Sequence, residues 1–92
     1  MVTAIVFISA DVESIPDVAQ RIADLDGVSE VYSVTGAIDL IAMVRVHSLD
    51  DVARTVADQL NKVPGVNQTE THIAFRAYSS LDLESAFSLG AQ

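Results

Sequence analysis

The sequence has no cysteine and few basic side chains, and each shortage excludes a class of function. Without cysteine there is no disulfide, no thiolate ligand for zinc and no thiol nucleophile. Only 5 Lys and Arg residues stand against 13 Asp and Glu residues, which gives a formal net charge of −8. The basic residues are scattered, so no patch can neutralise the phosphates of DNA or RNA, and direct nucleic-acid binding is not expected. An acidic surface also disfavours anionic membranes.

Long hydrophobic runs are absent as well. The apolar stretch at residues 2–8 is followed by Asp11 and Glu13 and has no basic region before it. It therefore indicates a strand, not a signal peptide or a membrane span, and the cytoplasm is the expected location. Half of the 92 residues are hydrophobic, which indicates one folded domain with more apolar surface than so small an interior can hide. Part of that surface is expected to be buried against another subunit.

Local patterns predict the element order β-α-β-β-α-β. Strands are expected over residues 2–9, 28–33, 40–46 and 69–75, where β-branched residues concentrate or polar and apolar residues alternate. The first of these is continuously apolar, which is typical of a strand covered on both faces. Helices are expected where apolar residues recur at helical spacing. These are Ile15, Val18, Ala19 and Ile22 in the first helix, and Leu49, Val52, Ala53, Val56, Ala57 and Leu60 in the second.

Polar residues at the helix ends fit these boundaries. Ser14 with Asp17 three residues later is typical of a capping box, and Ser48 with Asp51 repeats the pattern before the second helix. Gly27 is expected at the C′ position, where the first helix ends.

The doubled βαβ order predicts an α+β, ferredoxin-like fold: a four-stranded antiparallel sheet with both helices on one face. That arrangement leaves the other face bare. On the strand at 40–46, one set of residues would point one way (Leu40, Ala42, Val44 and Val46) and the other set the opposite way (Ile41, Met43 and Arg45), and neither set is polar enough for open water. We therefore expect the second face to pack on another copy as a two-fold dimer, sheet against sheet or edge to edge.

The chain is organised around the turn at residues 34–39, Val-Thr-Gly-Ala-Ile-Asp, between the second and third predicted strands. A tight antiparallel hairpin requires a residue that accepts positive φ, which Gly36 can supply. Asp39 stands just past the turn, and its carboxylate beside free N–H donors could hold both ends of a zwitterion. The alternative is an ordinary hairpin whose Asp caps its own turn through a side-chain-to-backbone bond.

No catalytic constellation stands out in the sequence. His47 and His72 have no carboxylate or second histidine at a ligand-like spacing, so no metal site is predicted. A nucleophile elbow and a phosphate-binding glycine loop are both missing. Thr69-Glu70-Thr71 places two hydroxyls on one face of a strand and a carboxylate on the other, offering mixed donors and acceptors. The simpler interpretation is that threonine is a good strand residue.

Taken together, these segments resemble the effector-binding domain, or RAM domain, of the Lrp/AsnC family of feast/famine transcription regulators. The resemblance covers residues 2–77 with spacings intact. It rests on Gly27-Val28-Ser29-Glu30-Val31, Val34-Thr35-Gly36-Ala37-Ile38-Asp39-Leu40, Leu60-Asn61-Lys62-Val63-Pro64-Gly65-Val66 and Thr69-Glu70-Thr71.

The resemblance implies the ferredoxin-like fold, dimers paired through their sheets in a dimeric α/β-barrel-like arrangement, and rings of such dimers. It also implies that an amino acid or related metabolite binds in clefts between subunits, with no cofactor. The ligand-binding residues it implies are Thr35, Gly36, Ala37, Ile38 and Asp39 from the turn, and Thr69, Glu70 and Thr71 from a neighbouring chain. Ile38 stands where the family commonly carries an aromatic residue, a departure expected to reshape the pocket or alter its selectivity.

Full-length members of that family carry a helix-turn-helix domain before the RAM domain, whereas this sequence begins at the first strand. We therefore expect a stand-alone, non-enzymatic sensor that oligomerises, binds an effector and modulates a full-length regulator by mixed assembly. Residues 1–77 are expected to form the domain and residues 78–92 a tail or short helix. Two alternatives stay open: a small dimeric ferredoxin-like enzyme of the monooxygenase or isomerase type, and a purely structural assembly module.

Overall fold

The predicted order of strands and helices is confirmed by the computed structural model, which describes residues 1–78 and 80. The strands are β1 (Val2–Ala10), β2 (Val28–Ser33), β3 (Leu40–Val46) and β4 (Val66–Ala74). The helices are α1 (Ile15–Ala23) and α2 (Leu49–Ala53), with the short helical segments η1 (Val12–Ser14), η2 (Arg54–Gln59) and η3 (Leu60–Lys62). The tail predicted for residues 78–92 lies outside the described residues, apart from Tyr78 and Ser80.

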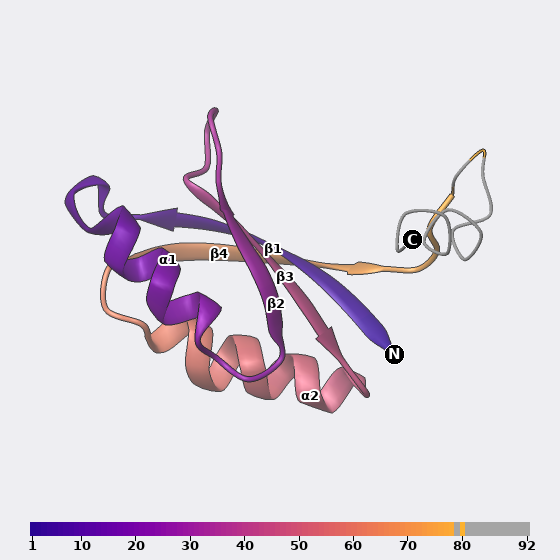
Figure 1. Ribbon diagram of the computed structural model, residues 1–92. Coiled ribbons are helices and arrows are strands. Elements are labelled where there is room, and N and C mark those ends of the chain that lie inside the picture. The colour runs from indigo at the N-terminus through magenta and orange to yellow at the C-terminus, as the bar shows by residue number, and fades with distance from the viewer. Residues whose placement is uncertain (79, 81–92) are drawn as a thin grey trace, which may run out of the picture.

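The four strands form one antiparallel sheet in the order β2-β3-β1-β4. β1 is central, so that Val6 lies opposite Ala42 of β3 on one side and Thr71 of β4 on the other. Both helices cover the same face of the sheet, and the loop between β2 and β3 extends beyond the rest of the molecule (Figure 1). The α+β ferredoxin-like prediction is therefore confirmed.

The hydrophobic core lies between the sheet and the helices. Every second residue of β1 and β3 faces it, which follows from the two-residue period of a strand. α1 contributes Val18 and Ile22, and the α2–η2–η3 layer contributes further aliphatic residues. The side chains with no exposed surface are Ala4, Val6, Ile8, Ile22, Leu40, Ala42, Val44 and Leu60.

The other face of the sheet, which we call the open face, carries the alternate residues. Ile5, Phe7, Ile41 and Met43 are only half-buried there. The sequence predicts that residues 2–9 are covered on both faces, but the described chain supplies helices for one face only. The open face therefore has an apolar centre that the described chain leaves without a cover.

Two predicted helix boundaries are wrong, because each depends on what precedes or follows the helix. Ser14 makes no side-chain cap: η1 leads directly into α1, so Ser14 lacks the extended backbone that a capping side chain needs. Gly27 is not the C′ residue, since α1 already ends at Ala23 with Asp24 as its cap. Ser48, in contrast, is extended, and its hydroxyl accepts a hydrogen bond from the Asp51 N–H at 3.2 Å, as predicted.

Gly27 lies instead in the connection to β2, with φ +91°. A Cβ there would lie 2.8 Å from both Thr55 Oγ1 and Val46 Cγ1, so this close approach requires glycine.

The second helix is α-helical only over its first part and continues as the π-helical segment η2. Of the predicted apolar stripe, Val52, Val56 and Leu60 are buried, whereas Leu49, Ala53 and Ala57 are exposed. Within η2 the buried residues are Thr55 and Val56. Within the described residues, no helix is long and apolar enough to cross a membrane.

Candidate functional site

The turn between β2 and β3 is fixed at both of its ends by backbone hydrogen bonds. The Val34 N–H donates to the Asp39 carbonyl at 3.1 Å, and the Asp39 N–H donates to the Ile8 carbonyl at 2.9 Å. Gly36 has φ +114°, as the hairpin prediction required, and a Cβ added there would meet nothing within 4 Å. The turn thus has a rigid base on β1 and a tip that stands free of the rest of the described chain.

Asp39 is half-buried, and its carboxylate binds outside its own turn. The Ala10 N–H donates to Asp39 Oδ2 at 2.9 Å, across 29 residues of sequence. The predicted alternative was a side chain that caps its own turn. The side chain of Asp39 instead accepts a backbone hydrogen bond at the end of β1. Among residues 1–78 and 80, Asp39 Oδ1 takes part in no hydrogen bond, so the carboxylate has acceptor capacity left.

The backbone of the turn tip also has unused donors. In the described part of the chain, the N–H groups of residues 35–38 donate to no backbone carbonyl. Thr35, Gly36 and Ala37 are exposed, and Ile38 is half-buried. A zwitterion requires hydrogen-bond donors for its carboxylate and an acceptor for its ammonium. The amides of the turn are such donors, and the free oxygen of the Asp39 carboxylate is such an acceptor.

The predicted Thr69-Glu70-Thr71 group is divided between the two faces of β4. Thr69 and Thr71 lie on the helix side, where the Thr69 hydroxyl donates to Asn61 Oδ1 at 2.7 Å. Glu70 lies on the open face. Because Thr69 pairs with Ile8 and the Asp39 N–H also binds Ile8, the turn and Thr69 flank the same end of β1 from opposite edges. One chain does not bring the two groups into contact.

His72 and Glu70 correct one detail of the sequence analysis. No carboxylate was expected at a useful spacing from either histidine, yet Glu70 Oε2 lies 2.6 Å from His72 Nε2. The two residues are two apart on one strand and therefore share a face. The Phe7 ring lies edge-on to His72, with centroids 5.1 Å apart. Within residues 1–78 and 80, no three His, Cys, Asp or Glu side chains gather as a metal site would require.

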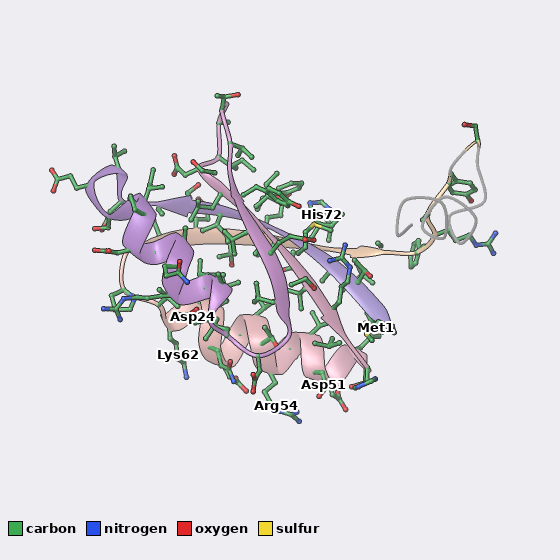
Figure 2. The ribbon with its side chains drawn as sticks, in the orientation of Figure 1. Met1, Asp24, Asp51, Arg54, Lys62 and His72 are labelled. Carbon is green, nitrogen blue, oxygen red and sulfur yellow. The ribbon has the colours of Figure 1, made fainter. Side chains whose placement is uncertain are left out.

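The histidines do not point into the space between sheet and helices, as an enzyme of the alternative type would need. Figure 2 shows His72 on the side of the sheet opposite Asp24, Arg54 and Lys62 of the helical layer. His47 is exposed at the end of β3. The space between the layers is filled by the aliphatic core.

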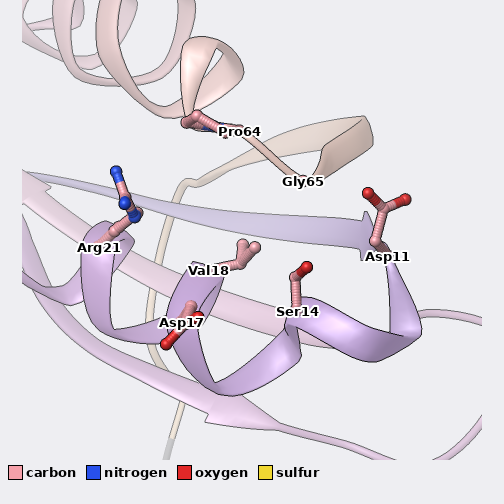
Figure 3. A pocket seen from close by; sticks show the side chains of 7 residues that line it. All are labelled: Asp11, Ser14, Asp17, Val18, Arg21, Pro64 and Gly65. Atoms are coloured by element: carbon pink, nitrogen blue, oxygen red, sulfur yellow. The ribbon is translucent and has the colours of Figure 1, made fainter.

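Sequence reasoning missed a pocket of about 290 Å³ between α1 and the loop before β4. Figure 3 shows the residues that line it: Asp11, Ser14, Asp17, Val18, Arg21, Pro64 and Gly65. Pro64 and Gly65 enter the sequence-based predictions only as part of a segment that carries the family resemblance. No local signal links them to residues 11–21, because the contact forms only when β4 returns beside β1.

Comparisons with known proteins agree on one family. The family model described as "Lrp/AsnC ligand binding domain" matches residues 3–82. A Pyrococcus furiosus protein named as the uncharacterized HTH-type transcriptional regulator PF0250 is 37% identical over 76 residues, which are 79% of this chain and 51% of that protein. The chain spans between 37% and 51% of the length of the first curated relatives it matches.

Solved structures show the same fold. The crystal structure of TTHA0845 from Thermus thermophilus superposes with a TM-score of 0.81 at 40% identity, covering 86% of this chain and 99% of that one. The Neisseria meningitidis transcriptional regulator NMB0573, solved as an L-Met complex, superposes with a TM-score of 0.73 at 18% identity, covering 92% of this chain and 58% of that one. At that identity the second likeness supports the fold alone.

Proposed function

The chain belongs to the Lrp/AsnC ligand-binding domain family, and on that premise we propose that it is a non-enzymatic module that binds an amino-acid effector between its subunits. The observation that carries this proposal is the state of Asp39. One carboxylate oxygen is fixed by the Ala10 N–H, and the other is uncommitted among residues 1–78 and 80 beside the free amides of residues 35–38. The bond to β1 orients the carboxylate without using up its charge.

A second protomer is the proposed other wall of the site. The turn tip is exposed in the isolated chain, and a flat, open turn does not enclose a small ligand. Thr69 and Thr71 lie on the opposite edge of β1, so in this proposal a neighbouring chain supplies them. The family model, which is described as a ligand binding domain, supports a bound effector, and we propose an amino acid because a protein of the same fold was solved as an L-Met complex.

Pairing of the open faces is the proposed route to that assembly. The Arg45–Glu30 ion pair borders the apolar centre of the open face, which consists of Ile5, Phe7, Ile41 and Met43. An apolar centre with a charged rim is the usual anatomy of a protein–protein interface. Dimers paired in this way would expose their turns to neighbouring dimers, which fits a ring of dimers.

The proposed mechanism is a shift in assembly state. An effector held between subunits favours the assembly that completes its site, in proportion to its difference in affinity for the two states. In this proposal a full-length regulator of the same family supplies contact with DNA by mixed assembly, because the acidic chain has no basic patch for phosphates.

The proposal is tested by screening the twenty amino acids for an increase in melting temperature, with the Asp39→Asn variant in parallel. Asparagine keeps an oxygen that can accept the Ala10 N–H but removes the charge that would pair with an ammonium. We expect a hit that stabilises the protein by about 2.7 kcal/mol at a hundredfold excess over its Kd. The stabilisation should disappear in Asp39→Asn and persist in Asp58→Asn, where an exposed carboxylate is changed.

A hit that survives Asp39→Asn would contradict the turn as the site. If no amino acid stabilises a protein that is nevertheless oligomeric, the structural assembly module replaces the sensor.

A further inference from the structure

We propose a second ligand site in the pocket beside α1, separate from the turn, which takes an elongated zwitterion: a carboxylate at one end and an ammonium at the other. The pocket lies within one chain, and it requires neither a second protomer nor Asp39. The proposal therefore goes beyond the turn site and does not depend on it.

The walls of this pocket are held rigidly. The Asp11 N–H donates to the Gly65 carbonyl at 2.9 Å, and Asn67 Nδ2 donates to Asp11 Oδ1 at 3.0 Å. Gly65 has φ +96°, and a Cβ there would lie 2.6 Å from Val18 Cγ2, so only glycine lets the loop lie this close to α1. A site whose walls are already in place loses little freedom when a ligand binds.

Opposite charges stand at the two ends of the pocket. In Figure 3 the Arg21 guanidinium lies at one end and the Asp11 carboxylate at the other, with Val18 and Ser14 between them. None of the hydrogen bonds or ion pairs among residues 1–78 and 80 involves the Arg21 side chain. Asp11 uses only Oδ1, which accepts the hydrogen bond from Asn67. Both charged groups are therefore available to a ligand.

The spacing of the charges selects the length of the ligand. Ser14 and Arg21 are seven residues apart, which is about 10 Å along a helix, and Asp11 lies beyond Ser14. The adjacent ammonium and carboxylate of one α-amino group cannot span this distance. A basic amino acid is about 7 Å long from its carboxylate to its distal ammonium, and a peptide of three residues is about 10 Å long. A hydrogen bond at each end adds about 3 Å, so either ligand can join Arg21 through its carboxylate to Asp11 through its distal ammonium.

The charge balance of the pocket agrees with this choice. Asp11 and Asp17 contribute two negative charges and Arg21 one positive charge, so the lining carries a net charge of −1. A basic amino acid carries one net positive charge and complements it, whereas an acidic ligand would be repelled by two carboxylates.

L-lysine and triglycine are the probes, titrated calorimetrically into the full chain. L-norleucine, which lacks the terminal ammonium, and 1,5-diaminopentane, which lacks the carboxylate, are the matched controls. We expect at least one probe to bind at one site per chain and both controls to bind at least tenfold more weakly. Binding of lysine alone or of triglycine alone identifies the source of the zwitterion.

Variants place the site. Arg21→Gln and Asp11→Asn should each weaken binding of that probe at least tenfold, and Asp11→Asn keeps an acceptor for Asn67. Arg54→Gln, which removes an exposed arginine elsewhere on the helical layer, should leave the affinity unchanged. In NMR spectra of the backbone amides, binding of the probe should change the chemical shifts of Gly65 and Val18 and leave that of Gly36 unchanged.

Three results would overturn the second site. The first is that neither probe binds at millimolar concentration. The second is that Arg21→Gln leaves the affinity unchanged. The third is that the changes in amide chemical shift are centred on Gly36. The last would assign the ligand to the turn and leave the effector proposal standing without this one.

Discussion

The two faces of the sheet are built from alternate residues of the same strands, yet their side chains are buried to different extents. On the helix side, Val6, Ile8 and Leu40 have no exposed surface. On the open face their immediate neighbours, Phe7 and Ile41, stay half-buried under no helix of the described chain. One face is thus completed within the chain, whereas the other has apolar groups that a second molecule can cover. The difference separates the residues that the chain buries by folding from those that it leaves half-buried.

The largest expected effect breaks the completed face. Ile8→Ala removes a fully buried side chain and leaves a cavity, so the free energy of unfolding should fall by about 2–5 kcal/mol. Phe7→Ala, one residue earlier and on the open face, is the matched variant. Urea unfolding at several protein concentrations distinguishes them: the loss in Ile8→Ala should not depend on concentration, and the loss in Phe7→Ala should. Equal, concentration-independent losses would show that the open face has no role in assembly.

The next effect breaks the open face alone. Met43→Asp places a carboxylate in its apolar centre, where pairing with a second copy would bury the charge. We expect the Kd of the dimer to rise at least about tenfold, which is about 1.4 kcal/mol, with circular dichroism of the monomer unchanged. Leu49→Asp is the control, because Leu49 is 61% exposed at the start of α2. Weakening by both variants alike would place the interface elsewhere.

The smallest effect concerns the rim of the open face. The Arg45–Glu30 pair is short, at 2.7 Å, but both side chains are about two-fifths exposed. Exposed pairs contribute little, so Glu30→Gln should change the free energy of unfolding by less than about 1 kcal/mol, and less still at high salt. Chemical denaturation at two salt concentrations measures this. A loss comparable to that of Ile8→Ala would mean that the rim, not the apolar centre, stabilises the molecule.

Much of this contrast could be predicted from the sequence, because it follows from patterns among residues that are close together in the chain. Neither alternate set of residues on β3 is polar, which predicted apolar surface on both faces of the sheet, and Ser48 with Asp51 predicted a helix start that the structure confirms. The positive φ of Gly36 followed from the geometry of a hairpin. These features depend on neighbours within a few residues.

The features that could not be predicted depend on partners far along the chain. The carboxylate of Asp39 accepts a hydrogen bond from the Ala10 N–H. Thr55 and Val46 lie so close to Gly27 that no Cβ fits there. Both contacts form only in the folded chain. The burial of Thr55 in the π-helical segment η2 was likewise not anticipated by the apolar periodicity. The pocket beside α1 belongs to the same class, since α1 and the loop before β4 meet only in the folded chain.

The central claim is that the open face is covered by a second copy of the chain. Sedimentation equilibrium of the unmodified protein across the micromolar range tests it most directly. We predict a dimer or a larger even-numbered assembly that dissociates on dilution. A single monomeric species throughout that range would contradict the claim and leave the apolar centre of the open face without an explanation.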